Sequence, residues 1–190
     1  MSLRNSISGW GVVTRSIHWI MAALILFMLG LGVYMTNFVP DPFRQFDLTQ
    51  LHKSWGFVVF CLAVTRVLWR LYDRTSPAEP ATMPRWQVIA AKSTHGLLYL
   101  LILVMPLSGW VLSAASPTQD LLNIRNMVFG WFAMPDPWVP GVKVISDTAG
   151  AVHYYAALLM AAILVLHVAA ALKHAFIDRD GVLSRMIIGK

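Results

Sequence analysis

Three long stretches without charge limit the folds that are open to this chain. Residues 16–40, 93–119 and 148–172 contain no aspartate, glutamate, lysine or arginine. About 20 apolar residues cross the hydrocarbon core of a bilayer as a helix, because each residue adds about 1.5 Å of rise. With 57% hydrophobic residues, 13% charged residues and a mean hydropathy of +0.62, the chain is too apolar for a soluble domain. These three stretches are therefore predicted to span a membrane.

A fourth span is predicted over residues 51–71, although charges interrupt it. Only twelve residues between Lys53 and Arg66 lack charge, but the stretch is apolar overall. Its charged residues lie near the two ends, where long side chains reach the headgroups or pair. Neither a long linker nor a repeat divides the chain. The prediction is a single all-α domain over residues 1–190, a transmembrane four-helix bundle with spans at residues 16–36, 51–71, 91–113 and 148–173.

The distribution of positive charge predicts the orientation of the bundle. Eleven of the fifteen lysines and arginines fall in the N-terminus, the second connection and the C-terminal tail. Cytoplasmic segments carry such an excess, so both termini are expected in the cytoplasm. The formal charge of +6 is then explained by topology and by contact with anionic lipid headgroups. Nucleic-acid binding is not predicted, because no motif for it is present.

The longest connection, residues 115–147, is predicted to lie on the outer face. It contains "DLLNIRNMVFGWFAMPDPWVP", an apolar and aromatic stretch that ends in prolines. This pattern indicates a short amphipathic helix at the membrane surface. A packed loop without any chemistry is an equally weighted alternative.

The histidines are the strongest functional signal, since an imidazole in hydrocarbon is costly unless something binds it. His153 and His167 are separated by about four turns of helix. This spacing corresponds to about 21 Å of helix rise and a difference of roughly 40° in direction, so both share one face at different depths. The predicted topology sorts the other histidines by depth. His52 lies at the outer level with His153. His18 and His95 lie at the inner level with His167, and His174 lies at the inner rim.

Two metal centres stacked across a membrane would need histidines at two depths. Haem iron takes two axial histidines from facing helices of a bundle. Zinc and di-iron centres also use cysteine or carboxylate ligands, and the spans contain no aspartate or glutamate. Cys61 is the single cysteine, so the chain has no C-x-x-C-H motif for covalent haem attachment. It also lies about 180° around its helix from His52. The residues predict two non-covalent b haems and leave open whether His18 or His95 completes the inner site.

Two arginines are candidate partners of haem propionates. Arg66 follows His52 by about four turns of helix and so shares its face at the inner level. Arg15 lies just before His18 in the sequence. A guanidinium pairs well with a carboxylate, although anchoring at the cytoplasmic surface would also explain both residues.

Several segments together resemble the bacterial cytochrome b561 family. They are "SIHWIMAALI", "LHKSWGFVVFCLAVTRVLWRL", "HGLLYLLILVMPLSGW", "FGWFAMP" and "HYYAALLMAAILVLHVAAALKH", and they cover nearly the whole chain. The resemblance implies a four-helix bundle with two b haems in the bacterial inner membrane. It implies iron ligation by His52 with His153 and by His18 with His167. The resemblance implies no requirement for a basic residue directly after His52, so Lys53 is a departure from the family pattern, and tuning of the outer haem or binding of an anion would explain it.

The same resemblance implies electron transfer across the membrane, linked to quinone. In stand-alone members it implies oxidation of superoxide at the periplasmic face with ubiquinone as acceptor. The alternative is a cytochrome b membrane anchor that relays electrons between quinone and a separate oxidoreductase subunit. A structural or transport bundle is disfavoured because it gives no reason for depth-paired histidines. The expected partners are membrane lipid, quinone, and superoxide or another periplasmic donor.

Lys53 and His95 have predicted roles of their own. Superoxide is an anion, so Lys53 beside the outer ligand is predicted to steer it, together with Arg125 and Lys143. Ordinary solvated loop charges would also explain Arg125 and Lys143. His95 is predicted to contact a propionate or to help form a quinone pocket, and a histidine wetted at the headgroups is the alternative.

Overall fold

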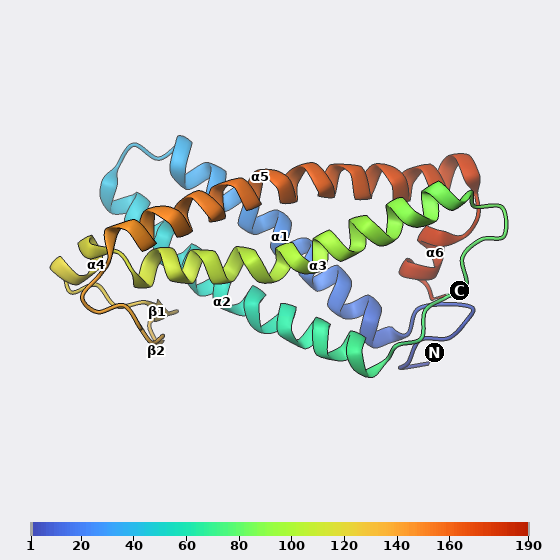
Figure 1. Ribbon diagram of the computed structural model, residues 1–190, viewed down its shortest axis with the longest axis horizontal. Coiled ribbons are helices and arrows are strands. Elements are labelled where there is room, and N and C mark those ends of the chain that lie inside the picture. The colour runs from blue at the N-terminus through green and yellow to red at the C-terminus, as the bar shows by residue number, and fades with distance from the viewer. Residues whose placement is uncertain (1, 190) are drawn as a thin grey trace.

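The computed structural model describes residues 2–189 and contains four long helices (Figure 1). They are α1 (Val12–Asn37), α2 (Pro42–Tyr72), α3 (Arg85–Ala114) and α5 (Lys143–Lys173). Each is long and apolar enough to cross a membrane, with α5 continuing to Asp178 for this purpose. The predicted all-α transmembrane bundle is therefore confirmed.

Both chain termini lie at the same end of the bundle, at the right of Figure 1, as an even number of spans requires. We call this the terminal end and the opposite one the loop end. The terminal end comprises residues 2–11, 73–84 and 174–189, and the loop end comprises residues 38–41 and 115–142.

The helices extend beyond the predicted spans, most of all at α2. This helix begins at Pro42, whereas the predicted span begins at residue 51. Asp41 caps it by accepting a 3.1 Å hydrogen bond from the backbone N–H of Phe43. Proline suits the first helical turn, because its missing N–H would have no partner there. The first connection is consequently only residues 38–41.

The loop end has a different structure from the amphipathic helix that the sequence predicts. A five-residue helix, α4 (Pro117–Leu121), is followed by a hairpin of β1 (Met127–Val128) and β2 (Phe132–Ala133). Between the strands, Phe129 and Gly130 have φ values of 49° and 75°, which interrupt any helix. The aromatic side chains pack on α2 instead, with 5.4 Å between the ring centres of Phe129 and Trp55.

The terminal end is closed by the C-terminal segment. The helix α5 ends in a π-helical turn, η1 (His174–Asp178), and the chain then turns back into α6 (Val182–Ile187). Arg179 and Gly181 have φ values of 52° and 79°, which reverse the chain direction. The indole N–H of Trp19 donates a 3.0 Å hydrogen bond to the carbonyl of Met186, so α6 is fastened to α1.

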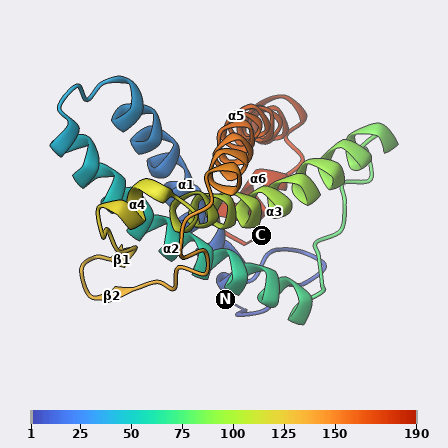
Figure 2. The same ribbon diagram turned by 60° about the vertical axis from the view of Figure 1, so that its left-hand side comes forward.

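The four long helices do not pack equally closely. The helix α3 packs along both α5 and α2, and α1 packs along α2. By contrast, the backbone of α5 makes few close approaches to α1 and α2, and Figure 2 shows α5 standing apart from both. Contacts across the space between α5 and the pair α1 and α2 must therefore come from side chains.

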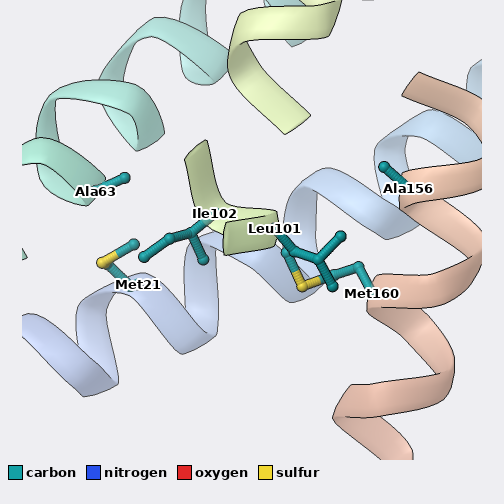
Figure 3. Close-up of a cluster of buried hydrophobic side chains, with 6 residues drawn as sticks. All are labelled: Met21, Ala63, Leu101, Ile102, Ala156 and Met160. Atoms are coloured by element: carbon teal, nitrogen blue, oxygen red, sulfur yellow. The ribbon is translucent and has the colours of Figure 1, made fainter. Parts of the chain in front are cut away.

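Figure 3 shows a cluster of buried apolar side chains that come from all four long helices. Within it, Met160 of α5 lies midway along the sequence between His153 and His167. Burial of such side chains stabilises the fold by about 25 cal/mol per Å² of apolar surface. This mid-bundle layer consists of Met21, Ala63, Leu101, Ile102, Ala156 and Met160.

Candidate cofactor sites

Two histidine pairs bridge the space beside α5, one at each end of the mid-bundle layer. At the loop end, His52 of α2 faces His153 of α5 with 6.2 Å between the ring centres. At the terminal end, His18 of α1 faces His167 of α5 with 6.3 Å between the ring centres. We call these the loop-end pair and the terminal-end pair.

The ring separations fit two imidazoles that ligate one metal ion from opposite sides. A metal–imidazole bond is about 2 Å long and each ring nitrogen lies about 1.1 Å from the ring centre, which together give about 6 Å between centres. Both pairs meet this requirement. In both pairs the two histidines come from different helices, as axial ligation of haem in a bundle requires.

Hydrogen bonds fix the tautomer of His153. Its Nδ1 lies 3.0 Å from the backbone carbonyl of Met105 and 3.2 Å from the hydroxyl of Ser108, both on α3. A carbonyl can only accept, so Nδ1 must carry the proton and donate it. The lone pair then lies on Nε2. The contact with Met105 therefore orients the ring for metal ligation through Nε2.

The second member of the loop-end pair, His52, has an unsatisfied nitrogen. Its Nδ1 is buried and has no hydrogen-bond partner among the residues described. Buried polar atoms without partners are rare in folded proteins, and they require an explanation such as a bound group. The unpaired nitrogen of His52 is consistent with a bound group beside this ring.

Two glycines lie against the loop-end pair, and the sequence reasoning missed both. A Cβ on Gly109 of α3 would lie 3.0 Å from Cε1 and 3.2 Å from Nδ1 of His153. A Cβ on Gly32 of α1 would lie 3.6 Å from Cε1 of His52. The signal was present, because Gly109 follows His95, and Gly32 follows His18, by the same spacing of about four helical turns that separates His153 from His167. Each long helix therefore places one residue in each of two layers.

The terminal-end pair has charged and polar neighbours where the loop-end pair has glycines. Arg66 of α2 donates a 3.2 Å hydrogen bond from Nη2 to Nδ1 of His18, and its guanidinium lies 5.4 Å from the ring centre of Tyr99. A guanidinium can only donate, so Nδ1 of His18 accepts and the ring proton lies on Nε2. Metal ligation through Nε2 would require the proton to leave this nitrogen, and a proton on Nδ1 would then exclude the hydrogen bond from Arg66.

His95 of α3 also contacts the terminal-end pair, but with a different geometry. Its ring centre lies 5.4 Å from that of His167 in a T-shaped arrangement. This separation is shorter than two imidazoles need on opposite sides of one ion. His95 itself is exposed. The ring distances thus favour His18 over His95 as the partner of His167.

Arg15 and Lys53 both hydrogen-bond to partners within the protein. Arg15 is buried, and its Nη1 donates a 2.8 Å hydrogen bond to the carbonyl of Ile187, which directs it to the C-terminal segment. Lys53 donates from Nζ to the side-chain oxygens of Ser113, Gln119 and Asn126. This geometry favours a role for Lys53 in holding the loop end over the steering of an anion from solvent.

The remaining candidates are exposed or bonded to carboxylates. His174 at the terminal end bonds Asp180 through Nδ1 at 2.6 Å, and Cys61 is exposed on α2. At the start of α5, next to the loop end, Lys143 forms an exposed ion pair with Asp147 at 2.7 Å, and Arg125 of the loop end is exposed. The surroundings of Lys143 and Arg125 are those of solvated loop charges.

Comparison with known proteins places the chain in one family. A family model described as prokaryotic cytochrome b561 matches residues 9–189. Cytochrome b561 homolog 2 of Escherichia coli (strain K12) is 34% identical over 187 residues, which cover 98% of this chain and 95% of the relative. Probable superoxide oxidase CybB of Yersinia pestis is 26% identical, with 90% and 91% covered, and cytochrome b561 homolog 1 of E. coli is 25% identical, with 90% and 92% covered. The chain therefore belongs to the prokaryotic cytochrome b561 family of multi-pass, haem-binding electron-transfer proteins of bacterial membranes.

Proposed function

We propose that this chain oxidises superoxide at the periplasmic face of the bacterial inner membrane and reduces ubiquinone, using two b haems. His52 and His153 would hold one haem, and His18 and His167 the other. Bound haem supplies reversible one-electron transfer at its iron. The observation that carries the proposal is the presence of two histidine pairs, with 6.2 and 6.3 Å between ring centres, at two depths along α5.

The chemistry balances with two superoxide anions for each quinone. Oxidation of one superoxide to dioxygen releases one electron, whereas reduction of a quinone to a quinol takes up two electrons and two protons. The 26% identical relative named as a probable superoxide oxidase supports this choice of donor. The excess of lysine and arginine at the terminal end supports a cytoplasmic location for both termini.

The polypeptide contributes binding, orientation and insulation. Met105 and Ser108 orient His153, and Arg66, which donates to His18, would pair with a haem propionate. The mid-bundle layer places buried apolar side chains of all four long helices at the depth between the two histidine pairs. Apolar surroundings of this kind disfavour ions, since burying a charge among such side chains is costly.

The decisive experiment exposes the purified, oxidised protein to an enzymatic source of superoxide and records its visible absorption. We expect the haem bands to show reduction, and we expect superoxide dismutase to suppress it. With a soluble ubiquinone analogue present, one quinol should form for every two superoxide anions consumed. A protein that holds both haems and is not reduced by superoxide would instead support a relay between quinone and a separate oxidoreductase subunit.

A His95→Ala variant is expected to retain both haems, because the 5.4 Å contact with His167 does not suit ligation of a shared ion. We expect a slower reduction of quinone or a shifted potential of one haem, since the ring borders the terminal-end pair. Haem content by the pyridine haemochrome assay is the measurement. If His95→Ala lost a haem while His18→Ala kept both, the proposed ligand pairing at the terminal end would be wrong.

A further inference from the structure

A buried polar network surrounds the side chain of Lys53, the residue that follows His52. Its Nζ donates to the hydroxyl of Ser113 at 3.0 Å, to the amide oxygen of Gln119 at 3.3 Å and to the amide oxygen of Asn126 at 3.0 Å. An ammonium has three hydrogens, so these three acceptors use all of them. Gln119 and Asn126 are only 7% and 3% exposed.

A carboxylate completes this network on the far side of the two amides. The amide nitrogen of Gln119 donates to Asp136 at 3.3 Å, and that of Asn126 donates to the other carboxylate oxygen. The positive charge of Lys53 and the negative charge of Asp136 are thus joined through two neutral side chains. Because each amide accepts on one side and donates on the other, its orientation is fixed by both charges.

The network joins three segments that are distant in sequence. Lys53 lies on α2, Ser113 lies near the end of α3, and the other three residues lie in the loop end. Ser54 adds a second attachment, because its hydroxyl accepts a 3.0 Å hydrogen bond from the backbone N–H of Phe129. The hairpin is therefore held on α2 directly beside the ligand candidate His52.

A fixed positive charge on the residue after His52 would act on a haem that His52 holds. Reduction by one electron adds one negative charge to the haem, and a nearby positive charge favours that state. Screening by salt is weak for a charge that is partly buried. Asp136 carries the opposite charge and would act in the opposite sense, and it is joined to Lys53 only through the two amides.

We propose that Lys53 is a positioning residue that pins the loop end onto α2 and raises the reduction potential of the loop-end haem. The second part of this inference rests on the proposed function, since it needs a haem on His52 and His153. Under this proposal, the ammonium of Lys53 acts on the haem from within the protein and does not steer an anion from solvent.

Redox titration of the purified holoprotein tests the electrostatic part. In Lys53→Met, the ratio of reduced to oxidised loop-end haem at a fixed ambient potential should fall about tenfold, which equals about 59 mV for a one-electron step. Asp136→Asn should raise the same ratio, and the terminal-end haem should not respond to either variant. Lys143→Met removes an exposed charge from the same end and should change nothing. If the potential of the loop-end haem were unchanged in Lys53→Met, the electrostatic role would be overturned, even if that variant oxidised superoxide more slowly.

Limited proteolysis tests the clamp without depending on haem. Arg125 is exposed in the loop end, directly before the buried Asn126. Trypsin should cleave after Arg125 faster in Lys53→Met than in the natural protein, and Lys53→Arg should restore much of the protection. Equal cleavage rates would overturn the clamp. A natural protein that contains no haem would refute the proposed function, and the proteolysis result would still decide whether Lys53 holds the loop.

Discussion

Replacing His153 with alanine is expected to remove one of two haems and to leave the other in place. His153 contributes to the loop-end pair only, and its partner His52 cannot by itself supply two axial ligands. The pyridine haemochrome assay should therefore fall from two haems per chain to one. His52→Ala should give the same loss, whereas His18→Ala and His167→Ala should each remove the other haem, identified by its own potential in a redox titration.

His174→Ala is the matched control for these four variants. It removes an imidazole that directly follows α5, where Nδ1 of His174 is bonded to Asp180 at 2.6 Å. Both haems should remain in this variant. A natural protein with one haem per chain would contradict the two-site arrangement, and so would a loss of both haems in every single histidine variant.

Replacing Gly109 with valine is expected to remove the loop-end haem although all four histidines remain. The first added carbon atom would already lie 3.0 Å from the ring of His153, closer than ordinary van der Waals contact. Overpacking of this kind costs about 1–3 kcal/mol and is relieved by moving the side chain. A displaced His153 would lose its hydrogen bond to Met105 and its alignment with His52. Haem content should fall toward one per chain.

Gly96→Val is the control for Gly109→Val, because it places the same β-branched residue on the same helix. No heavy atom of the described residues lies within 4 Å of the position of a Cβ on Gly96, outside its own helical turn. The cost to helix stability should be similar in both variants, so a loss of haem that occurs only in Gly109→Val reports the contact with His153. Two haems per chain in Gly109→Val would show that the ring tolerates the added side chain.

The four spans could be predicted from the sequence, but their ends could not. A segment that crosses the hydrocarbon core must be apolar, so the runs without charge indicate which segments span the membrane. The helix α2 begins at Pro42, well before the predicted span, because Asp41 and Pro42 start it outside that apolar run. Capping by these two residues is a local signal that hydropathy does not contain.

The loop end shows a second limit of sequence reasoning. The aromatic stretch near Phe129 predicted a surface helix, since apolar residues there would rest on lipid. In the structure, Phe129 packs on Trp55 and Phe132 packs on Phe57, so α2 takes the place expected for lipid. The same apolar residues suit either partner, and only the position of α2 decides between a helix on lipid and a hairpin on protein.

The relative depth and the shared face of His153 and His167 follow from their spacing alone. Helix rise and twist are set by local backbone geometry, so a separation of about four turns places two residues at two levels of one face in any fold. Contacts between helices settle the rest: His18 rather than His95 stands 6.3 Å from His167, Gly109 leaves room for His153, and the charge of Lys53 points into the protein. These contacts join residues that are distant in sequence, and no local periodicity specifies which helix faces which.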